Sequence, residues 1–303
     1  MNRITRREFV MLAAAGSVAV PFASHTETAY GQGTLTAQAI VDRIKLKSGG
    51  EWKPDTVDNF KAGDPATVVK GVVTTAMATI DVLRQAVQSG ANLIITCEPT
   101  YYSKADASTP PVGRGGTAAA PDPVLNAKND FIRKNQLVIW RFSEHWRQIT
   151  PDPLAIGLTD ALGWSKLRAA DNPALVTMPA TSLNSVVSDL KKKLNARGGI
   201  RVVGDPQLKV QKVGLLPGTT AIQAALKLLP QVDAIIAGEV REWESVEYVR
   251  DKITAGEKKS LILLGRVVSE NSGMNECAKW VKSLVPELPA KWIPVDDPYW
   301  RPA

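Results

Sequence analysis

Short apolar runs that end in polar clusters constrain the fold of this chain more than any other feature. Residues 93–96, 137–140, 234–237 and 261–264 are such runs, and charged or hydrogen-bonding residues follow each one directly. Continuous apolar runs of this length, separated by helical stretches, are typical of strands that are buried on both faces of a parallel sheet. Because parallel strands bring their carboxyl ends to one edge, the residues after these runs are candidates for a site.

The first of these runs belongs to a β-α-β unit. Residues 68–75 are rich in β-branched side chains, and residues 79–88 carry their apolar side chains on one helical face. Ser89-Gly90 then supplies the helix stop before the run at residues 93–96. We predict that residues 68–75 and 93–96 form adjacent parallel strands, because the helix between them is long enough for a right-handed crossover.

The middle of the chain reads as a smaller second α/β unit. Helices are expected at residues 183–195 and 220–229, and strands at 200–203 and 213–216. After the last apolar run a further helix is expected at about residues 273–284, with Cys277 as a buried core residue on it. The turn at residues 217–220 (Pro-Gly-Thr-Thr) can bind an anion, but a plain helix N-cap is the favoured reading. The predicted fold class is therefore α/β, with mostly parallel sheets.

The N-terminal sequence is typical of a twin-arginine signal. Arg6 and Arg7 are followed by Phe9 and by the apolar, small-residue run 11–23, which holds no acidic residue. Since a spanning helix needs about 20 apolar residues, we expect no stable membrane span. Residues 1–32 are thus predicted to direct export by the twin-arginine route to the periplasm or the extracellular space. No cleavage site stands out, so an uncleaved anchor remains the alternative.

Composition excludes several classes of function. The net charge is +7, but the lysines are dispersed, and the run 191–193 lies on a segment with helical apolar spacing. Nucleic acid is therefore not an expected partner. The two cysteines, Cys97 and Cys277, do not form a disulfide framework, and the two histidines, His25 and His145, are too few to supply a metal site alone. Sulfur and oxygen would have to provide most ligands of any metal.

Four motifs, in order along the chain, resemble the Ngg-interacting-factor-three (Nif3) family, also described as GTP cyclohydrolase type-2-like. Asp58-Asn59 with Gly63-Asp64-Pro65 resembles its Asp-Asn-x-Gly-Leu opening, and residues 94–99 (Ile-Ile-Thr-Cys-Glu-Pro) resemble Ile-Thr-His-His-Pro. Gly238-Glu239-Val240 resembles Thr-Gly-Glu. Residues 265–270 (Gly-Arg-Val-Val-Ser-Glu) resemble Gly-His-x-x-Ser/Thr-Glu, with Gly273-Met274 following in register.

This resemblance implies two interlinked α/β units, one from residues 34–165 with 256–303 and one from residues 166–255. It also implies ring-shaped homo-oligomers and a dinuclear metal centre, but several ligand positions differ here. Cys97 and Glu98 stand where the family has its two histidines, and Arg266 stands where the last motif has histidine, while Glu270 keeps its type and spacing. A guanidinium cannot bind a metal and repels a second cation. At the remaining position, either His145 or Glu144 could stand in for the family's aspartate.

These positions leave two functional hypotheses. One is a hydrolase with one zinc, iron or manganese ion on Cys97, Glu98, His145 and Glu270, with Glu242 or Glu98 as general base and Arg266 binding an anionic, possibly phosphate-containing small molecule. The other is a non-catalytic oligomeric binding or assembly protein without metal, in which Arg266 pairs with Glu270 or Glu98. Metal analysis distinguishes them.

The signal reading gives the first testable prediction. Replacing both Arg6 and Arg7 by Lys should abolish export, because the paired guanidinium groups are what the twin-arginine receptor reads. The distribution of the protein between cytoplasmic and exported fractions measures this, with a single Arg3→Lys variant as the control. Undiminished export of the double variant would contradict the signal assignment.

Overall fold

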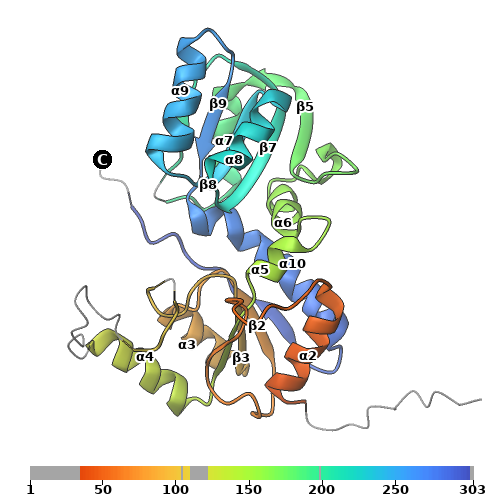
Figure 1. The fold of residues 1–303 in the computed structure, drawn as a ribbon, viewed down its shortest axis with the longest axis vertical. Coiled ribbons are helices and arrows are strands. Elements are labelled where there is room, and N and C mark those ends of the chain that lie inside the picture. The colour runs from red at the N-terminus through yellow and green to blue at the C-terminus, as the bar shows by residue number, and fades with distance from the viewer. Residues whose placement is uncertain (1–34, 104, 110–121, 198, 301–303) are drawn as a thin grey trace, which may run out of the picture. The chain divides into compact units, whose positions relative to one another are not determined.

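A computed structural model describes residues 35–103, 105–109, 122–197 and 199–300, which belong to one compact unit. The predicted signal at residues 1–32 lies outside the described residues. Within the described part the chain forms two five-stranded sheets flanked by helices (Figure 1). The predicted α/β class with mostly parallel sheets is confirmed.

The first sheet has the strand order β1-β4-β3-β2-β10. Strands β10 (Ala290–Trp292), β2 (Val72–Thr75), β3 (Leu93–Thr96) and β4 (Val138–Arg141) are parallel, and β1 (Phe60–Ala62) pairs antiparallel with β4 at the edge. Val72 lies opposite Leu93 in the register of β2 and β3. The predicted parallel pair is therefore confirmed.

Local signals set the bounds of the crossover helix α3 (Ile80–Gln88). The hydroxyl of its N-cap, Thr79, accepts a hydrogen bond from the amide of Val82 at 3.2 Å. Gly90 follows the helix with a φ of 77°, a conformation that glycine adopts at little cost, and the chain turns there into β3. The buried side of α3, with Val82, Leu83 and Ala86, covers the sheet.

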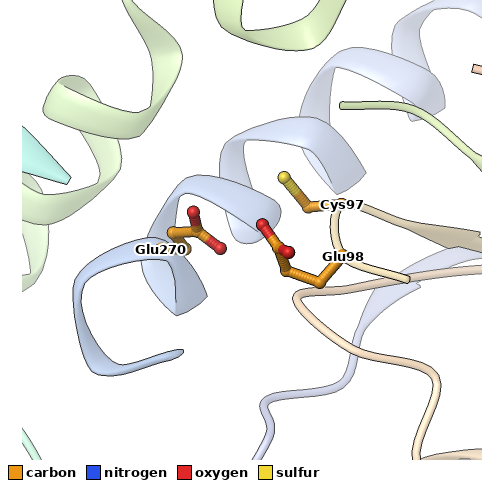
Figure 2. Close-up of side chains that lie close together, drawn as sticks. All are labelled: Cys97, Glu98 and Glu270. Atoms are coloured by element: carbon orange, nitrogen blue, oxygen red, sulfur yellow. The ribbon is translucent and has the colours of Figure 1, made fainter. Parts of the chain in front are cut away.

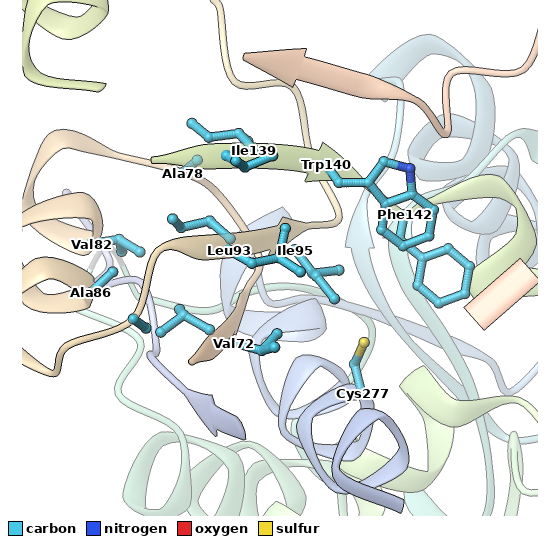
Figure 3. Close-up of a cluster of buried hydrophobic side chains, with 14 of the residues drawn as sticks. Val72, Ala78, Val82, Ala86, Leu93, Ile95, Ile139, Trp140, Phe142 and Cys277 are labelled. Atoms are coloured by element: carbon cyan, nitrogen blue, oxygen red, sulfur yellow. The ribbon is translucent and has the colours of Figure 1, made fainter. Parts of the chain in front are cut away.

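The core of this unit lies around the central strands (Figure 3). Leu93, Ile94 and Ile95 are fully buried, and each contributes about 1.5–3 kcal/mol by leaving water. Helices α2 (Ala37–Ser48) and α4 (Pro123–Lys134) also belong to this unit. Cys277 is fully buried in the same cluster, as the sequence predicted for it.

The second sheet has the order β5-β7-β8-β9-β6. Strands β7 (Lys209–Thr219), β8 (Ala234–Glu239) and β9 (Ser260–Leu263) are parallel, while β5 (Leu175–Ser182) and β6 (Arg201–Val203) are antiparallel edge strands. The associated helices are α7 (Leu183–Lys193), α8 (Ile222–Leu228) and α9 (Glu247–Thr254).

Helix α10 (Arg266–Leu284) packs on both sheets, against β7 and β8 with one part and against β2 and β10 with another (Figure 1). It also crosses α6 (Pro153–Ala161) very closely. A Cβ atom on Gly157 would lie 2.4 Å from the carbonyl oxygen of Ser272, and one on Gly273 would lie 2.8 Å from Cα of Leu154. Two glycines therefore permit the backbones of α6 and α10 to touch.

Three element bounds differ from the sequence expectation. Helix α10 begins at Arg266, not near residue 273, so that Glu270 lies inside the helix. The boundary expected at residue 256 does not separate the sheets, because β9 pairs with β8 in the second sheet while β10 joins the first. Strand β7 continues to Thr219, so Gly218 is a strand residue and not a helix cap. Long-range strand pairing decides the second and the third of these differences.

Among the described residues no helix is both long and apolar enough to cross a membrane.

The close crossing of α6 and α10 gives the second prediction. Gly273→Ala should lower the free energy of unfolding by about 1–3 kcal/mol, because the added methyl group meets backbone that cannot rotate away. Chemical denaturation measures the change. Ser283→Ala, on the exposed side of the same helix, is the control and should stay within about 0.5 kcal/mol. Equal effects of the two variants would contradict the close crossing.

Candidate functional site

Three buried side chains with metal-binding donor atoms lie together where the first sheet meets α10. The sulfur of Cys97 and one carboxylate oxygen each of Glu98 and Glu270 are all within 4.8 Å of one another. Figure 2 shows Cys97 and Glu98 on the chain after β3, facing Glu270 on α10. Each of the three residues is at most 1% exposed. Five residues were expected to converge at this edge, Cys97, Glu98, His145, Arg266 and Glu270, and these three of them lie together here.

Strand pairing delivers Cys97 and Glu98 to this point. After β3 ends at Thr96, the amide of Cys97 donates to the carbonyl of Thr75 at 3.2 Å, and that of Glu98 donates to Ala76 at 2.9 Å. These two bonds hold the chain after β3 against the chain after β2, and both side chains are buried there. Pro99 follows and prevents further pairing, because proline has no amide hydrogen.

Two glycines of the second sheet let it approach Glu270. A Cβ atom on Gly218 would lie 2.2 Å from Oε1 of Glu270, and one on Gly238 would lie 2.3 Å from Oγ of Ser269. The amide of Gly218 instead donates to Oγ of Ser269 at 2.9 Å. Strands β7 and β8 therefore fix the first turns of α10, and with them the carboxylate of Glu270.

Helix α5 (Glu144–Gln148) brings a residue into the site that the sequence analysis did not select, Arg147. The N-terminus of α5 is capped by a distant carboxylate, because Asp58 accepts hydrogen bonds from the amides of Ser143 at 2.6 Å, Glu144 at 3.1 Å and His145 at 2.8 Å. Asp58 is only 1% exposed. The opening motif of the resemblance thus positions the helix that carries Arg147.

The guanidinium of Arg147 lies among the three donor atoms. Its Nη2 atom is 3.5 Å from Sγ of Cys97 and 3.1 Å from Oε1 of Glu98, and it donates a very short hydrogen bond to Oε1 of Glu270. One nitrogen therefore contacts all three groups that could hold a metal. The Arg147 side chain is 28% exposed, so the guanidinium is mostly enclosed.

A second guanidinium completes the charge balance. Nη2 of Arg266 forms an ion pair with Oε2 of Glu98 at 2.5 Å, and its side chain is 34% exposed. Two buried carboxylates thus meet two arginines. Oε2 of Glu270 and Nε of Arg266 have no hydrogen-bond partner among the described residues, although both atoms are buried. Oε2 of Glu98 also makes no hydrogen bond with a described residue, and its contact with Nη2 of Arg266 is an ion pair alone. These three atoms are the unsatisfied hydrogen-bonding positions of the cluster.

Burial shifts the pKa values of the groups in the cluster. Burial, followed by the negative charge of Glu270, raises the pKa of the Cys97 thiol to about 12, so the thiol is protonated near neutral pH. For Arg147, burial lowers the pKa, but the charges of Glu270 and Glu98 and the hydrogen bond to Glu270 outweigh it and raise the pKa above its ordinary value. Arg147 is therefore charged at any working pH.

Glu270, in contrast to Arg147, favours its uncharged form. Burial raises its pKa to about 7, although Arg147 acts to lower it, and the charge of Glu98 raises it further. The raised pKa of Arg147 indicates a strong ion pair, whereas the raised pKa of Glu270 indicates a carboxyl group that is costly to ionise. At Glu270 burial outweighs the ion pair, because the side chain is fully enclosed and shares one guanidinium with Glu98.

His145 lies apart from the three donor atoms. Its Nδ1 is 2.8 Å from Oδ2 of Asp58, and its Nε2 is 3.4 Å from the carbonyl oxygen of Glu51. The ring stacks on Trp52, with centroids 3.6 Å apart and an interplanar angle of 2°. The expectation that His145 joins a metal ligand set is not met, because α5 directs this side chain to the aromatic core. Glu144, the other candidate, accepts a hydrogen bond from Thr56 instead.

Glu242, expected as a general base, also lies elsewhere. It begins the π-helix Glu242–Val246 and pairs with Arg201 at 2.7 Å, with both side chains more than 60% exposed. Such an exposed pair contributes little to stability and marks no site. Of the residues predicted to act in catalysis, Arg266 and the alternative base Glu98 lie in the cluster, and Glu242 does not.

The residues present do not fit the dinuclear centre that the resemblance implies. The described residues offer three donors at this point, one of them a protonated thiol, and an arginine occupies the position that a cation would take. A second ion would also meet Arg266. The chemistry that this arrangement supports is electrostatic, with two fixed guanidinium groups held by buried acids.

The geometry defines the molecule as a two-sheet α/β protein with a buried acid, thiol and guanidinium cluster. No protein-family model matches the sequence, and no curated protein matches it. Solved structures do match. Staphylococcus aureus hypothetical protein SA1388 aligns with 88% of this chain and 99% of its own at a TM-score of 0.65 and 13% identity.

Two other solved structures show the same fold. A Bacillus cereus protein related to NIF3 aligns with 88% of this chain and 99% of its own, at a TM-score of 0.63 and 14% identity. HcgD from Methanocaldococcus jannaschii aligns with 85% of this chain and 97% of its own, at a TM-score of 0.58 and 14% identity. The chain therefore has the Nif3-like fold, as its motifs predicted.

The raised pKa of Glu270 gives the third prediction. Because the folded protein holds this proton more tightly than the unfolded chain, its contribution to stability is full below about pH 4.5 and is lost as the pH rises through about 7. Glu270→Gln should remove this fall in stability. Denaturation at several pH values between 5 and 8, in the presence of a chelator, measures it.

Glu276→Gln is the control for this experiment, because Glu276 pairs with Lys279 on the same helix outside the cluster. That variant should keep the fall in stability seen in the wild type. If Glu270→Gln and Glu276→Gln behave alike, Glu270 is not the titrating group.

Proposed function

We propose that this chain is a binding protein of Nif3-like fold whose site works without a metal ion. The carrying observation is the position of Arg147, whose Nη2 atom contacts Cys97, Glu98 and Glu270 at once. An arginine and a divalent cation cannot share these ligands, because both carry positive charge and need the same oxygens. The guanidinium serves as the fixed cation of the site.

Charge balance supports this proposal. Removing two carboxylates from water costs several kcal/mol per ion unless each is paired. Glu98 has Arg147 on one oxygen and Arg266 on the other, and Glu270 has Arg147. No further cation is needed to neutralise the cluster. The ligand that fits the partly exposed outer faces of two arginines is a small anionic molecule.

The proposal extends to location and assembly. The twin-arginine pattern at Arg6 and Arg7 supports export, so the protein would act in the periplasm or outside the cell. The family resemblance supports a homo-oligomer. We therefore propose an exported oligomeric binding or assembly protein.

A second candidate is a hydrolase with one metal ion, as the sequence first suggested. The observation that favours it is the buried Oε2 atom of Glu270, which has no partner among the described residues, together with three donors within 4.8 Å. This candidate requires Arg147 to leave the cluster and the Cys97 thiol to lose its proton. Both changes oppose the electrostatics described above.

Metal content and stability together test the proposal. The purified protein should contain zinc, iron and manganese only in amounts far below one ion per chain. Arg147→Ala should lower the free energy of unfolding by about 2–4 kcal/mol, because it leaves buried carboxylates short of a partner. Elemental analysis and chemical denaturation provide the two measurements.

Arg84→Ala is the control, since the Arg84–Asp81 pair is exposed and should contribute less than about 1 kcal/mol. One ion per chain in the wild type, reduced by both Cys97→Ala and Glu270→Gln and raised by Arg266→His, would establish the hydrolase candidate instead. A metal-free wild type that loses no stability in Arg147→Ala would contradict the arginine-based site.

A further inference from the structure

A cavity lies away from the arginine cluster, and residues next to the amino ends of strands in the first sheet line part of it. It has a volume of about 840 Å³, within the range of pockets that hold small organic ligands. Asn92 lines it at the amino end of β3, whereas Cys97 follows the carboxyl end of the same strand. The cavity is thus separate from the site above.

Hydrogen bonds hold the walls of this cavity. The side chain of Asn92 accepts from the amide of Lys70 at 2.8 Å and donates to the carbonyl of Val68 at 2.9 Å. On the opposite wall, the hydroxyl of Tyr101 donates to Oδ1 of Asn129 at 2.8 Å. These bonds link β3, the segment before β2, and α4 around the space. The cavity is therefore preformed.

The lining is positively charged. Lys61, Lys70 and Arg133 line it, and Asp64 is the acidic residue among the described lining residues. Asp64 already accepts a hydrogen bond from the amide of Ala66 at 2.9 Å. Arg133 pairs with Asp130 on the surface of α4. Lys61 and Lys70 therefore give the cavity its positive charge.

Lys61 is the residue that points most directly to a ligand. It is partly buried on the edge strand β1, and within the described chain its ammonium makes no hydrogen bond and no ion pair. Burial lowers the pKa of Lys61, and the charge of Arg141 lowers it further, although the charges of Asp106, Asp58 and Glu144 act to raise it. Those carboxylates make no ion pair with Lys61, so its ammonium remains able to contact an anion that enters the cavity.

We propose that this cavity binds a small organic anion, a phosphorylated or carboxylated molecule, with Lys61 and Lys70 contacting its charged group. The volume admits a molecule of nucleotide size or smaller. The polar side chains of Gln136 and Asn129 line the same space and can orient the uncharged part of the ligand. This inference is independent of the arginine-based site.

Calorimetric titration of the full chain with adenosine monophosphate, pyrophosphate and citrate tests the proposal. At least one probe should bind, and added salt should weaken the binding. Lys61→Gln and Lys70→Gln should each weaken it at least about tenfold, which corresponds to about 1.4 kcal/mol. The three probes distinguish whether the cavity prefers a nucleotide, an inorganic phosphate or a carboxylate as its ligand.

Lys134→Gln is the control, because it removes the same charge from an exposed position on α4 outside the lining. It should leave binding unchanged. Lys70→Gln alters an exposed side chain, so it remains informative if Lys61→Gln fails to fold. The proposal is overturned if no probe binds, if both lysine variants bind like the wild type, or if Arg266→Gln alone abolishes binding.

Discussion

The contact of one guanidinium with three buried groups is the interaction on which the rest of the site depends. Arg147 joins Cys97 and Glu98 from the first sheet to Glu270 on α10. Its position requires the cap that Asp58 provides to α5 and the close approach that Gly218 permits to β7. A single charge interaction therefore links β3, α5 and α10, and the second sheet is built to admit it.

The same dependence explains why the cluster tolerates buried acids. A carboxylate at the position of Glu270 is costly, because the site excludes water. The cost is offset by geometry, since α5 and α10 hold the guanidinium and the carboxylate in place before they meet. The raised pKa of Glu270 shows that the compensation is incomplete. Shifted pKa values of this kind are common at functional sites, where burial and charged neighbours act together.

Sequence predicted the fold well, because its strongest signals are local. The apolar runs at β3, β8 and β9 mark central strands, and the crossover length fixes the pairing of β2 with β3. The sequence did not predict correctly which of the two sheets each strand joins. β9 joins the second sheet through pairing with β8, a long-range contact that no local pattern at residues 260–263 specifies.

For the site, sequence identified Cys97, Glu98, Arg266 and Glu270, but it missed Arg147 and placed His145 wrongly among the candidates. Both errors have one physical cause: on a helix of five residues, side chains two positions apart face different ways, and the cap from Asp58 sets which one enters the cluster. Charge counting could have found Arg147. Two buried acids need more than one cation, and Arg147 lies on the helix that follows the β4 terminus.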